Sequence, residues 1–442
     1  HAKIVLLLPI PSFLTDSAGI WDPVIKSKII PITQKIAHDT GTNSIDLYQL
    51  FVDKPGLVPD LIHPSSLGAT LIAKRLFEEI TASYEQSFDL IENLEISKKR
   101  KSSFYGFEQT DFQFEGSQAK IVIPKHTLKG KPWIWRARFW GHQPQTDIAL
   151  LERGFHLVYC DISNLYGAPK AVHRWNSFYN MVTQAGLSKK VVLEGMSRGG
   201  LIIYNWAVAN PNKVACIYAD APVLDGKSWP GGFGLGKGYR SGWQEFKKVY
   251  GLNSEMDEKN FKGNPIDQIK KISEAGFPMF HVCGEADSVV PVDENTKIFE
   301  RKLLENNADI TVIYKKGIDH HPHSLKNPTP IVNFILRATG YKINFANILA
   351  PGSEYRSAAG WEEGKGWWAQ ANDIDSLCKN SGNIDLLLIG NSITQGWGGS
   401  RTLTTYKPGQ ESADIHFKEL KWINAGISGD RTQHVAWRLE NG

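Results

Sequence analysis

Cysteine is scarce in this sequence, and its spacing argues against any paired site. Four cysteines occur in 442 residues, none in a CxxC pair, and three lie in apolar, strand-like runs where a free thiol packs as a small hydrophobic group. We therefore expect neither a zinc site nor a disulfide framework. Long apolar runs are also missing. None reaches the roughly 18 residues of a membrane helix, so no membrane insertion is expected, and no signal peptide is recognisable.

Neither sign of charge dominates the chain. Lysine and arginine total 50 against 46 for aspartate and glutamate, which is too even to supply the field that draws a protein onto nucleic acid. The exception is the basic run KKRK at 98–101, which we interpret as a solvated linker, with a targeting or polyanion-binding segment as the alternative. Because the chain begins with His1 rather than Met, the compartment stays open. A secreted or periplasmic location is favoured only if the full-length protein carries a signal peptide.

The order of apolar segments predicts an α/β protein. A buried strand is expected over 3–10, an amphipathic helix over 27–38, a second strand over 44–51 and a helix over 67–84. After a polar stretch at 92–103, apolar strands alternate with helical segments, which is typical of a mostly parallel, doubly wound sheet. We expect four parts: 1–90, an α/β domain at 104–340, a connector rich in Gly, Ser and Trp at 341–383, and another α/β unit at 384–442.

The segment VVLEGMSRGGLIIYNWAVAN carries G-x-S-x-G between an apolar strand and a helix. Small residues at Gly195 and Gly199 let strand and helix pack closely around a strained Ser197. The hydroxyl is then held above the sheet edge, and the backbone N–H of Arg198 points to where an oxyanion would form. This context favours Ser197 as a nucleophile. An incidental tight turn is the alternative.

A candidate acid follows a later strand, in the order nucleophile, acid, histidine. The segment FPMFHVCGEADSVVPVDENT places Asp287 just beyond the strand, where its carboxylate can orient an imidazole. Asp293 and Glu294 are nearby rivals.

The candidate base lies on the loop KKGIDHHPHSL after the last strand. We favour His320, with His321 next. These residues and His323 also suggest a metal site, but no cysteine or carboxylate cluster accompanies them, and one short loop does not easily bring three nitrogens together. No metal or other cofactor is therefore expected.

From about 104 to 340 the chain resembles the α/β-hydrolase superfamily, specifically its prolyl-oligopeptidase-like and acyl-esterase members. The resemblance rests on the strand, G-x-S-x-G turn and helix around Ser197, a corner called the nucleophile elbow, and on the GEAD and GxxH segments downstream. It implies Ser197 as nucleophile, Asp287 as acid and His320 as base.

The same resemblance implies a second oxyanion donor on the loop after an early strand, here RARFWGHQPQ. A backbone N–H near Trp140 or Gly141 is the candidate. The usual HGGG form of this loop is absent.

Two further segments have competing interpretations. SWPGGFGLGKGYRSG has nearly the spacing of a P-loop, but Gly238 stands where Ser or Thr would hold magnesium, so a flexible loop over the active site is expected. The tryptophans of WIWRARFW, with Trp175 and Trp229, suggest a sugar-stacking platform, and core packing explains them equally well.

Both ends of the chain resemble the SGNH (GDSL-type) hydrolases. IDLLLIGNSITQGWGG and WINAGISGDRTQHVAWRLENG match the first two blocks, which implies Ser392 as nucleophile and the Gly426 N–H as an oxyanion donor, although Asn391 replaces the more usual Asp. PDLIHPSSLGATLIAKRL matches the last block, which implies His63 as base and Asp60 as the group that orients it. The resemblance implies partial flavodoxin-like, three-layer α/β/α pieces flanking the central domain.

The order of these blocks is wrong for one domain, and the block that ends in an oxyanion-binding Asn is missing. We interpret the chain as a fragment cut inside two SGNH domains that flank an α/β hydrolase. A circular permutant with an insert is the alternative.

The sequence therefore predicts a serine ester hydrolase that works through an acyl-enzyme. Pairing of the two module types suggests an acylated carbohydrate as the favoured substrate, within the class of small-molecule and oligosaccharide esters, by analogy. A serine peptidase of the prolyl-oligopeptidase type and a non-catalytic glycan-binding scaffold are the alternatives.

Overall fold

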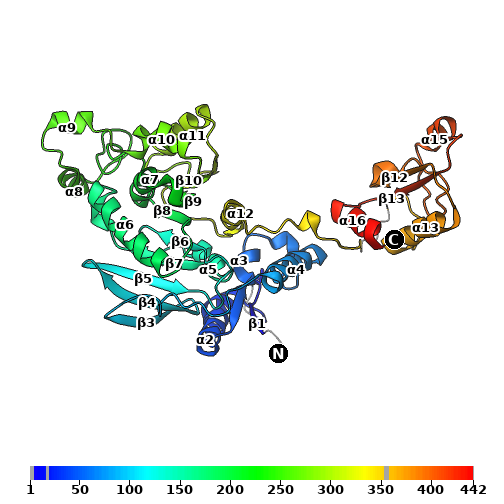
Figure 1. Ribbon diagram of the computed structural model, residues 1–442, viewed down its shortest axis with the longest axis horizontal. Helices are drawn as coiled ribbons and strands as arrows, with labels where there is room; N and C mark the ends of the chain where they lie inside the picture. Colours follow the sequence, from blue (N-terminus) through cyan, green and yellow to red (C-terminus); the bar gives the residue numbers. More distant parts are fainter. Residues whose placement is uncertain (1–3, 16–18, 353–357, 442) are drawn as a thin grey trace. The chain divides into compact units, whose positions relative to one another are not determined.

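The computed structural model describes residues 4–15, 19–352 and 358–441 (Figure 1). The chain divides into two compact units, His1–Lys342 and Ile343–Gly442. No helix in the described part of the chain is long and apolar enough to span a membrane.

A large mixed sheet organises the first unit, with the strand order β11-β10-β9-β8-β6-β7-β5-β4-β3. Strands β11 to β7 of this order pair in parallel, and β5, β4 and β3 join antiparallel at one end (Figure 1). The expected α/β sheet with mostly parallel central strands is therefore confirmed, as a mixed sheet consistent with an α/β hydrolase. The strands are β3 Lys99–Phe104, β4 Phe107–Phe114, β5 Ser117–Ile123, β6 Trp133–Arg136, β7 His156–Cys160, β8 Val191–Met196, β9 Val214–Asp220, β10 Met279–Gly284 and β11 Ile310–Lys315.

Helices cover both faces of this sheet, so its central strands are buried on both sides. On β6, Trp133 and Trp135 join one apolar cluster, which includes residues of α6, α7, α10 and α11, whereas Ile134 joins another with residues of α5 and α12. This alternation follows from the two-residue period of a strand. The helices of this region are α5 Gln145–Leu151, α6 Pro169–Gln184, α7 Gly199–Ala209, α8 Arg240–Tyr250, α9 Glu255–Asn260, α10 Ile269–Ala275, α11 Thr296–Glu305 and α12 Thr329–Ala338.

The basic run at 98–101 was predicted to be a linker, and this prediction is wrong. Most of it lies in β3, which pairs with β4 at the edge of the sheet. Arg100 Nη2 lies 3.3 Å from Asp111 Oδ2, and Lys101 Nζ lies 2.9 Å from Glu108 Oε1. Charges on an edge strand hinder pairing with other chains, which is a physical reason for this run to lie there.

The N-terminal segment carries a two-stranded parallel sheet, β1 Val5–Leu8 and β2 Asn43–Asp46. The strand expected over 44–51 is wrong in its second half, which forms α3 Leu47–Phe51 because the Asp46 carboxylate caps that helix by accepting from the Gln49 N–H at 2.9 Å. The other elements are α1 Asp22–Val24, a π-helical turn at Ile25–Ile29, α2 Ile30–Thr40 and α4 Ser66–Thr81.

Polar contacts join the N-terminal segment to the large sheet's domain. The buried Glu152, which follows α5, accepts from the Asp46 N–H at 2.6 Å and lies 3.8 Å from Arg75 of α4. Burial raises the pKa of Glu152 to about 8, against the opposing charge of Arg75. These residues all belong to the unit His1–Lys342, and the expected boundary at 92–103 within that unit stays a prediction.

The second unit contains a parallel pair, β12 Leu386–Gly390 and β13 Trp422–Gly426. Its helices are α13 Trp367–Asn380, α14 Ser392–Gln395, α15 Gln410–His416 and α16 Thr432–Asn441. The region 341–383 is thus more than a connector, because α13 lies within it and buries Ala371 and Ile374 in the same apolar cluster as Ala425.

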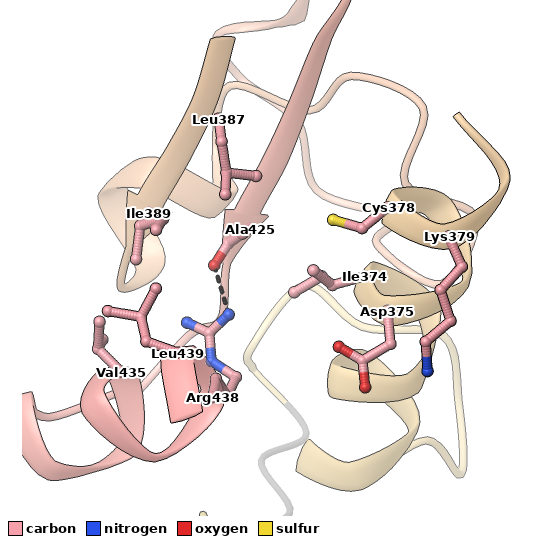
Figure 2. A pocket seen from close by; sticks show the side chains of 10 residues that line it. All are labelled: Ile374, Asp375, Cys378, Lys379, Leu387, Ile389, Ala425, Val435, Arg438 and Leu439. Atoms are coloured by element: carbon pink, nitrogen blue, oxygen red, sulfur yellow. Dashed lines mark hydrogen bonds between the residues drawn. The ribbon is translucent and has the colours of Figure 1, made fainter. Parts of the chain in front are cut away.

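A cavity of about 370 Å³ opens among α13, the two strands and α16 of the second unit (Figure 2). Leu387 and Ile389 of β12 contribute apolar side chains, and Arg438 of α16 donates to the Ala425 carbonyl of β13 at 2.8 Å. Ser392 is not among the residues that line this cavity.

Candidate active site

Ser197 sits at the corner between β8 and α7 with a left-handed φ of 50°. Its N–H donates to the Asp220 carbonyl at 2.8 Å, and its own carbonyl accepts from the Gly200 and Val223 N–H groups, each at 2.9 Å. Three backbone hydrogen bonds thus hold a conformation that a serine rarely adopts.

The corner tolerates no side chain at some of its glycines. A Cβ at Gly195 would lie 2.8 Å from the Gly199 carbonyl oxygen, and one at Gly200 would lie 2.7 Å from Pro222 Cβ. A Cβ at Gly199, in contrast, would meet its nearest neighbour at an ordinary 3.5 Å. The structure therefore explains Gly195 of the motif and not Gly199.

The structure brings Ser197, Asp287 and His320 together, all of them buried. His320 Nδ1 donates to Asp287 Oδ2 at 2.7 Å, and Nε2 lies 3.0 Å from Ser197 Oγ. Because Nδ1 carries the proton in this arrangement, Nε2 is left to accept the Ser197 hydroxyl proton.

Two loops fix the acid and the base against each other. The other oxygen of Asp287 accepts from the N–H groups of Val289 and Val290, at 2.9 and 2.7 Å. Asp319 accepts from the Ser288 N–H and from the His320 N–H, both at 2.7 Å, and these bonds hold its pKa below the usual range. The loop after β10 is therefore tied to the loop after β11 directly beside His320.

The rival acids have other partners. Asp293 pairs with Lys297 at 2.8 Å on the surface, and Glu294 accepts from Ser228 Oγ at 2.6 Å and from the Leu235 N–H. Glu294 thus anchors the glycine-rich segment that was expected to be a loop over the site.

The remaining histidines of the late loop are not placed like His320. His321 is exposed, with its ring centroid 5.1 Å from that of His320. His323 is buried, and its Nδ1 donates to Asp220 Oδ1 at 2.6 Å. Asp220 therefore holds the nucleophile Ser197 through its carbonyl and the loop after β11 through its carboxylate. Sequence reasoning missed this role, although the place of Asp220 at the end of an apolar strand was a signal.

The candidate oxyanion donors are backbone N–H groups at the start of α7 and on the loop after β6. Within the described ranges, no protein group accepts from the N–H of Arg198, Trp140 or Gly141. The choice between Trp140 and Gly141 stays open.

A buried arginine shapes the loop that carries two of these donors. Arg136 donates to the carbonyls of Arg138, Phe139 and His142, so these carbonyls turn toward the guanidinium. Sequence reasoning missed this residue, although a charge within the apolar run WIWR was a signal.

The same guanidinium is neutralised beneath the elbow. Arg136 Nη1 lies 2.5 Å from Asp147 Oδ2 and 3.0 Å from Glu194 Oε1, and all three side chains are buried. Burial raises the pKa of Glu194 despite the charge of Arg136. The cluster joins β8, which precedes Ser197, to the loop after β6.

The predicted sugar platform is mostly core. Trp133, Trp135 and Trp175 are fully buried, and the rings of Trp135 and Trp175 stack with centroids 3.9 Å apart. Trp140 and Trp229 are partly exposed.

The residues proposed from the SGNH resemblance lie in different units. Asp60 and His63 form an exposed pair in the first unit, with Oδ2 and Nδ1 2.6 Å apart, and Ser392 begins α14 in the second. Hydrogen bonds from the His63 and Ile62 N–H groups help to lower the pKa of Asp60 to about 2.

The oxyanion role expected of Gly426 stays a prediction. Its N–H donates to Asn424 Oδ1 at 2.9 Å, so an oxyanion would have to replace this bond. The SGNH assignment itself stays a prediction.

Comparison with known proteins gives one family match. Residues 181–340 match the model of the prolyl oligopeptidase family. This range contains Ser197, Asp287 and His320.

A short segment is similar to an acetylxylan esterase of Xylanibacter ruminicola, with 44% identity over 73 residues. The match covers 16% of this chain and 15% of that protein, so the chain spans only a small part of this relative.

Similar solved structures include a puromycin-hydrolyzing peptidase of Mycobacterium tuberculosis, with 12% identity and a TM-score of 0.41, over 55% of this chain and 39% of that one. An S-formylglutathione hydrolase from Agrobacterium tumefaciens has 15% identity and a TM-score of 0.37, over 55% and 96%. An acylaminoacyl peptidase of Pyrococcus horikoshii has 14% identity and a TM-score of 0.40, over 58% and 44%.

Proposed function

We propose that this chain is a serine ester hydrolase in which Ser197 is the nucleophile, His320 the general base and Asp287 the group that orients the base. The observation that carries the proposal is the pair of hydrogen bonds made by His320, 3.0 Å to Ser197 Oγ and 2.7 Å to Asp287. The match to the prolyl oligopeptidase family over 181–340 supports the serine hydrolase class.

In the first step, Ser197 Oγ attacks the ester carbonyl while His320 Nε2 takes its proton. The Arg198 N–H and an N–H near Trp140 or Gly141 stabilise the oxyanion, and His320 then protonates the departing alcohol. His320 then deprotonates a water molecule, which attacks the acyl-enzyme. The bond between the acyl carbon and Ser197 Oγ breaks, the acid is released, and His320 returns the proton to Ser197 Oγ. Ser197 and His320 thus carry every proton transfer of the cycle.

The favoured substrate is an acylated carbohydrate or a small ester. Support comes from the short match to an acetylxylan esterase and from the resemblance of both chain ends to SGNH hydrolases. Hydrolysis depends, in this proposal, on Ser197 and not on Ser392. We also retain the proposed parts 1–90 and 384–442 as pieces of SGNH domains.

A serine peptidase is the second candidate, because the family model matched over 181–340 is that of prolyl oligopeptidases. Rates on p-nitrophenyl acetate and acetylated xylo-oligosaccharides, compared with peptide p-nitroanilides, separate the two functions. We expect ester hydrolysis that is lost in Ser197→Ala and kept in Ser392→Ala. Hydrolysis of peptides alone would favour the peptidase, and no hydrolysis of either class would favour the glycan-binding scaffold.

A further inference from the structure

Three histidines lie close together beside the proposed base without a part in the proposed hydrolysis. His142 belongs to the loop after β6, and His321 and His323 belong to the loop after β11. One ligating nitrogen from each lies within 4.8 Å of the other two. Over residues 4–15, 19–352 and 358–441, no other set of three metal-binding side chains has this geometry.

This group differs from the one that the sequence suggests. His320 is engaged by Ser197 and Asp287, and the third imidazole comes instead from a distant loop. The difficulty of bringing three nitrogens together from one short loop therefore does not arise.

His323 has the surroundings of a metal ligand. It is 4% exposed, and its Nδ1–H donates to Asp220, which also accepts from the Ser324 N–H at 2.8 Å and the Tyr218 hydroxyl at 3.0 Å. A carboxylate on one ring nitrogen fixes the tautomer and leaves the other nitrogen, Nε2, to bind a metal.

We propose that His142, His321 and His323 bind one divalent transition metal ion of imidazole preference, such as Zn²⁺. Zinc–nitrogen bonds of about 2.0–2.1 Å place tetrahedral ligand atoms about 3.4 Å apart. His142 and His321 are exposed, so rotation of their side chains can close the group around the fixed His323. Three protein ligands leave a fourth position for water or another small ligand.

Bound metal would join the loop that carries Trp140 and Gly141 to the loop that carries His320. The His320 ring centroid lies 4.7 Å from that of His323 and 5.1 Å from that of His321. A dication there opposes the positive charge that His320 gains in acyl transfer, so the ion inhibits hydrolysis. This second part rests on the proposed function.

The binding test uses the full chain without substrate, titrated with Zn²⁺ against a chromophoric chelator. We expect one site whose Kd rises at least tenfold in His142→Ala and in His321→Ala, and is unchanged in His173→Ala, which removes another exposed imidazole of the same unit. Far-UV circular dichroism checks that each variant is folded. Absence of a 1:1 site, or equal Kd values in all four proteins, would overturn the proposal.

The inhibition test measures p-nitrophenyl acetate hydrolysis with Zn²⁺ and after its removal by a chelator. The wild type should slow reversibly, whereas the rate of His142→Ala with Zn²⁺ should equal the rate of the same variant after the chelator. Zinc that binds without slowing the wild type would overturn the inhibitory role. Failure of the proposed function has a different signature, namely no hydrolysis by the metal-free wild type.

Discussion

The two glycines of the G-x-S-x-G motif should respond differently to the same substitution. In Gly195→Ala the added Cβ would lie 2.8 Å from the Gly199 carbonyl oxygen and 2.9 Å from its carbon, which are backbone atoms of α7. The strand and helix must separate by roughly half an ångström to restore an ordinary contact. In Gly199→Ala the nearest atom is 3.5 Å away, so the methyl group fits.

The size of the effect follows from the displacement of Ser197. Misplacement by about 1 Å can cost about 100-fold in rate, so half of that displacement predicts a kcat about tenfold lower for Gly195→Ala. Overpacking should also lower stability by about 1–3 kcal/mol. For Gly199→Ala we expect kcat within about threefold of the wild type, since no displacement is required.

Steady-state kinetics on p-nitrophenyl acetate, with urea unfolding of each variant, measure both effects. Equal kcat losses in the two variants, or a wild-type rate in Gly195→Ala, would refute the steric account of the elbow.

Three further predictions concern the surroundings of the site. Arg136→Met leaves two buried carboxylates without their counter-charge, so the free energy of unfolding measured in urea should fall by about 3–5 kcal/mol. An unchanged urea midpoint would show that the Arg136 cluster does not stabilise the fold. His320→Ala should abolish ester hydrolysis while His321→Ala retains it, and the reverse result would reassign the base. Burial lowers the pKa of His156 to about 4 and of His281 to about 3. The unfolded chain therefore binds these protons below about pH 6.5 while the folded chain does not, and stability should fall by about 2 kcal/mol per histidine from pH 7 to 5. A urea midpoint that stays level or rises over that range would contradict this.

The parts of the site that sequence predicts are those with local signals. The nucleophile corner needs only a strand, a tight turn and a helix, all within 191–209. Asp287 and His320 each follow an apolar strand, and parallel strands deliver such residues to the same edge of the sheet. The G-x-S-x-G motif, periodicity and chain order therefore favoured the three residues that the structure brings together, although Asp293, Glu294 and His321 stayed open as alternatives.

The parts that sequence could not supply depend on contacts between distant segments. Arg136 is explained only by Asp147, Glu194 and the carbonyls that it holds, and His142 meets His321 and His323 only in the folded chain. Nothing in the local pattern specifies these partners.

Errors in the expected elements have a similar origin. The basic run at 98–101 has the composition of a linker, yet pairing with β4 makes most of it a strand. Aromatic enrichment fits a sugar platform and a core equally well, and the full burial of Trp133, Trp135 and Trp175 decides for the core.

A fluorophosphonate probe can show whether Ser197 is the activated nucleophile. The probe bonds covalently to an activated serine hydroxyl, and peptide mass spectrometry then identifies the labelled residue. We predict a single adduct on the peptide containing Ser197, which disappears in His320→Ala. An adduct on Ser392 in place of Ser197, or no adduct in the folded wild-type chain, would contradict the assignment of Ser197 as nucleophile.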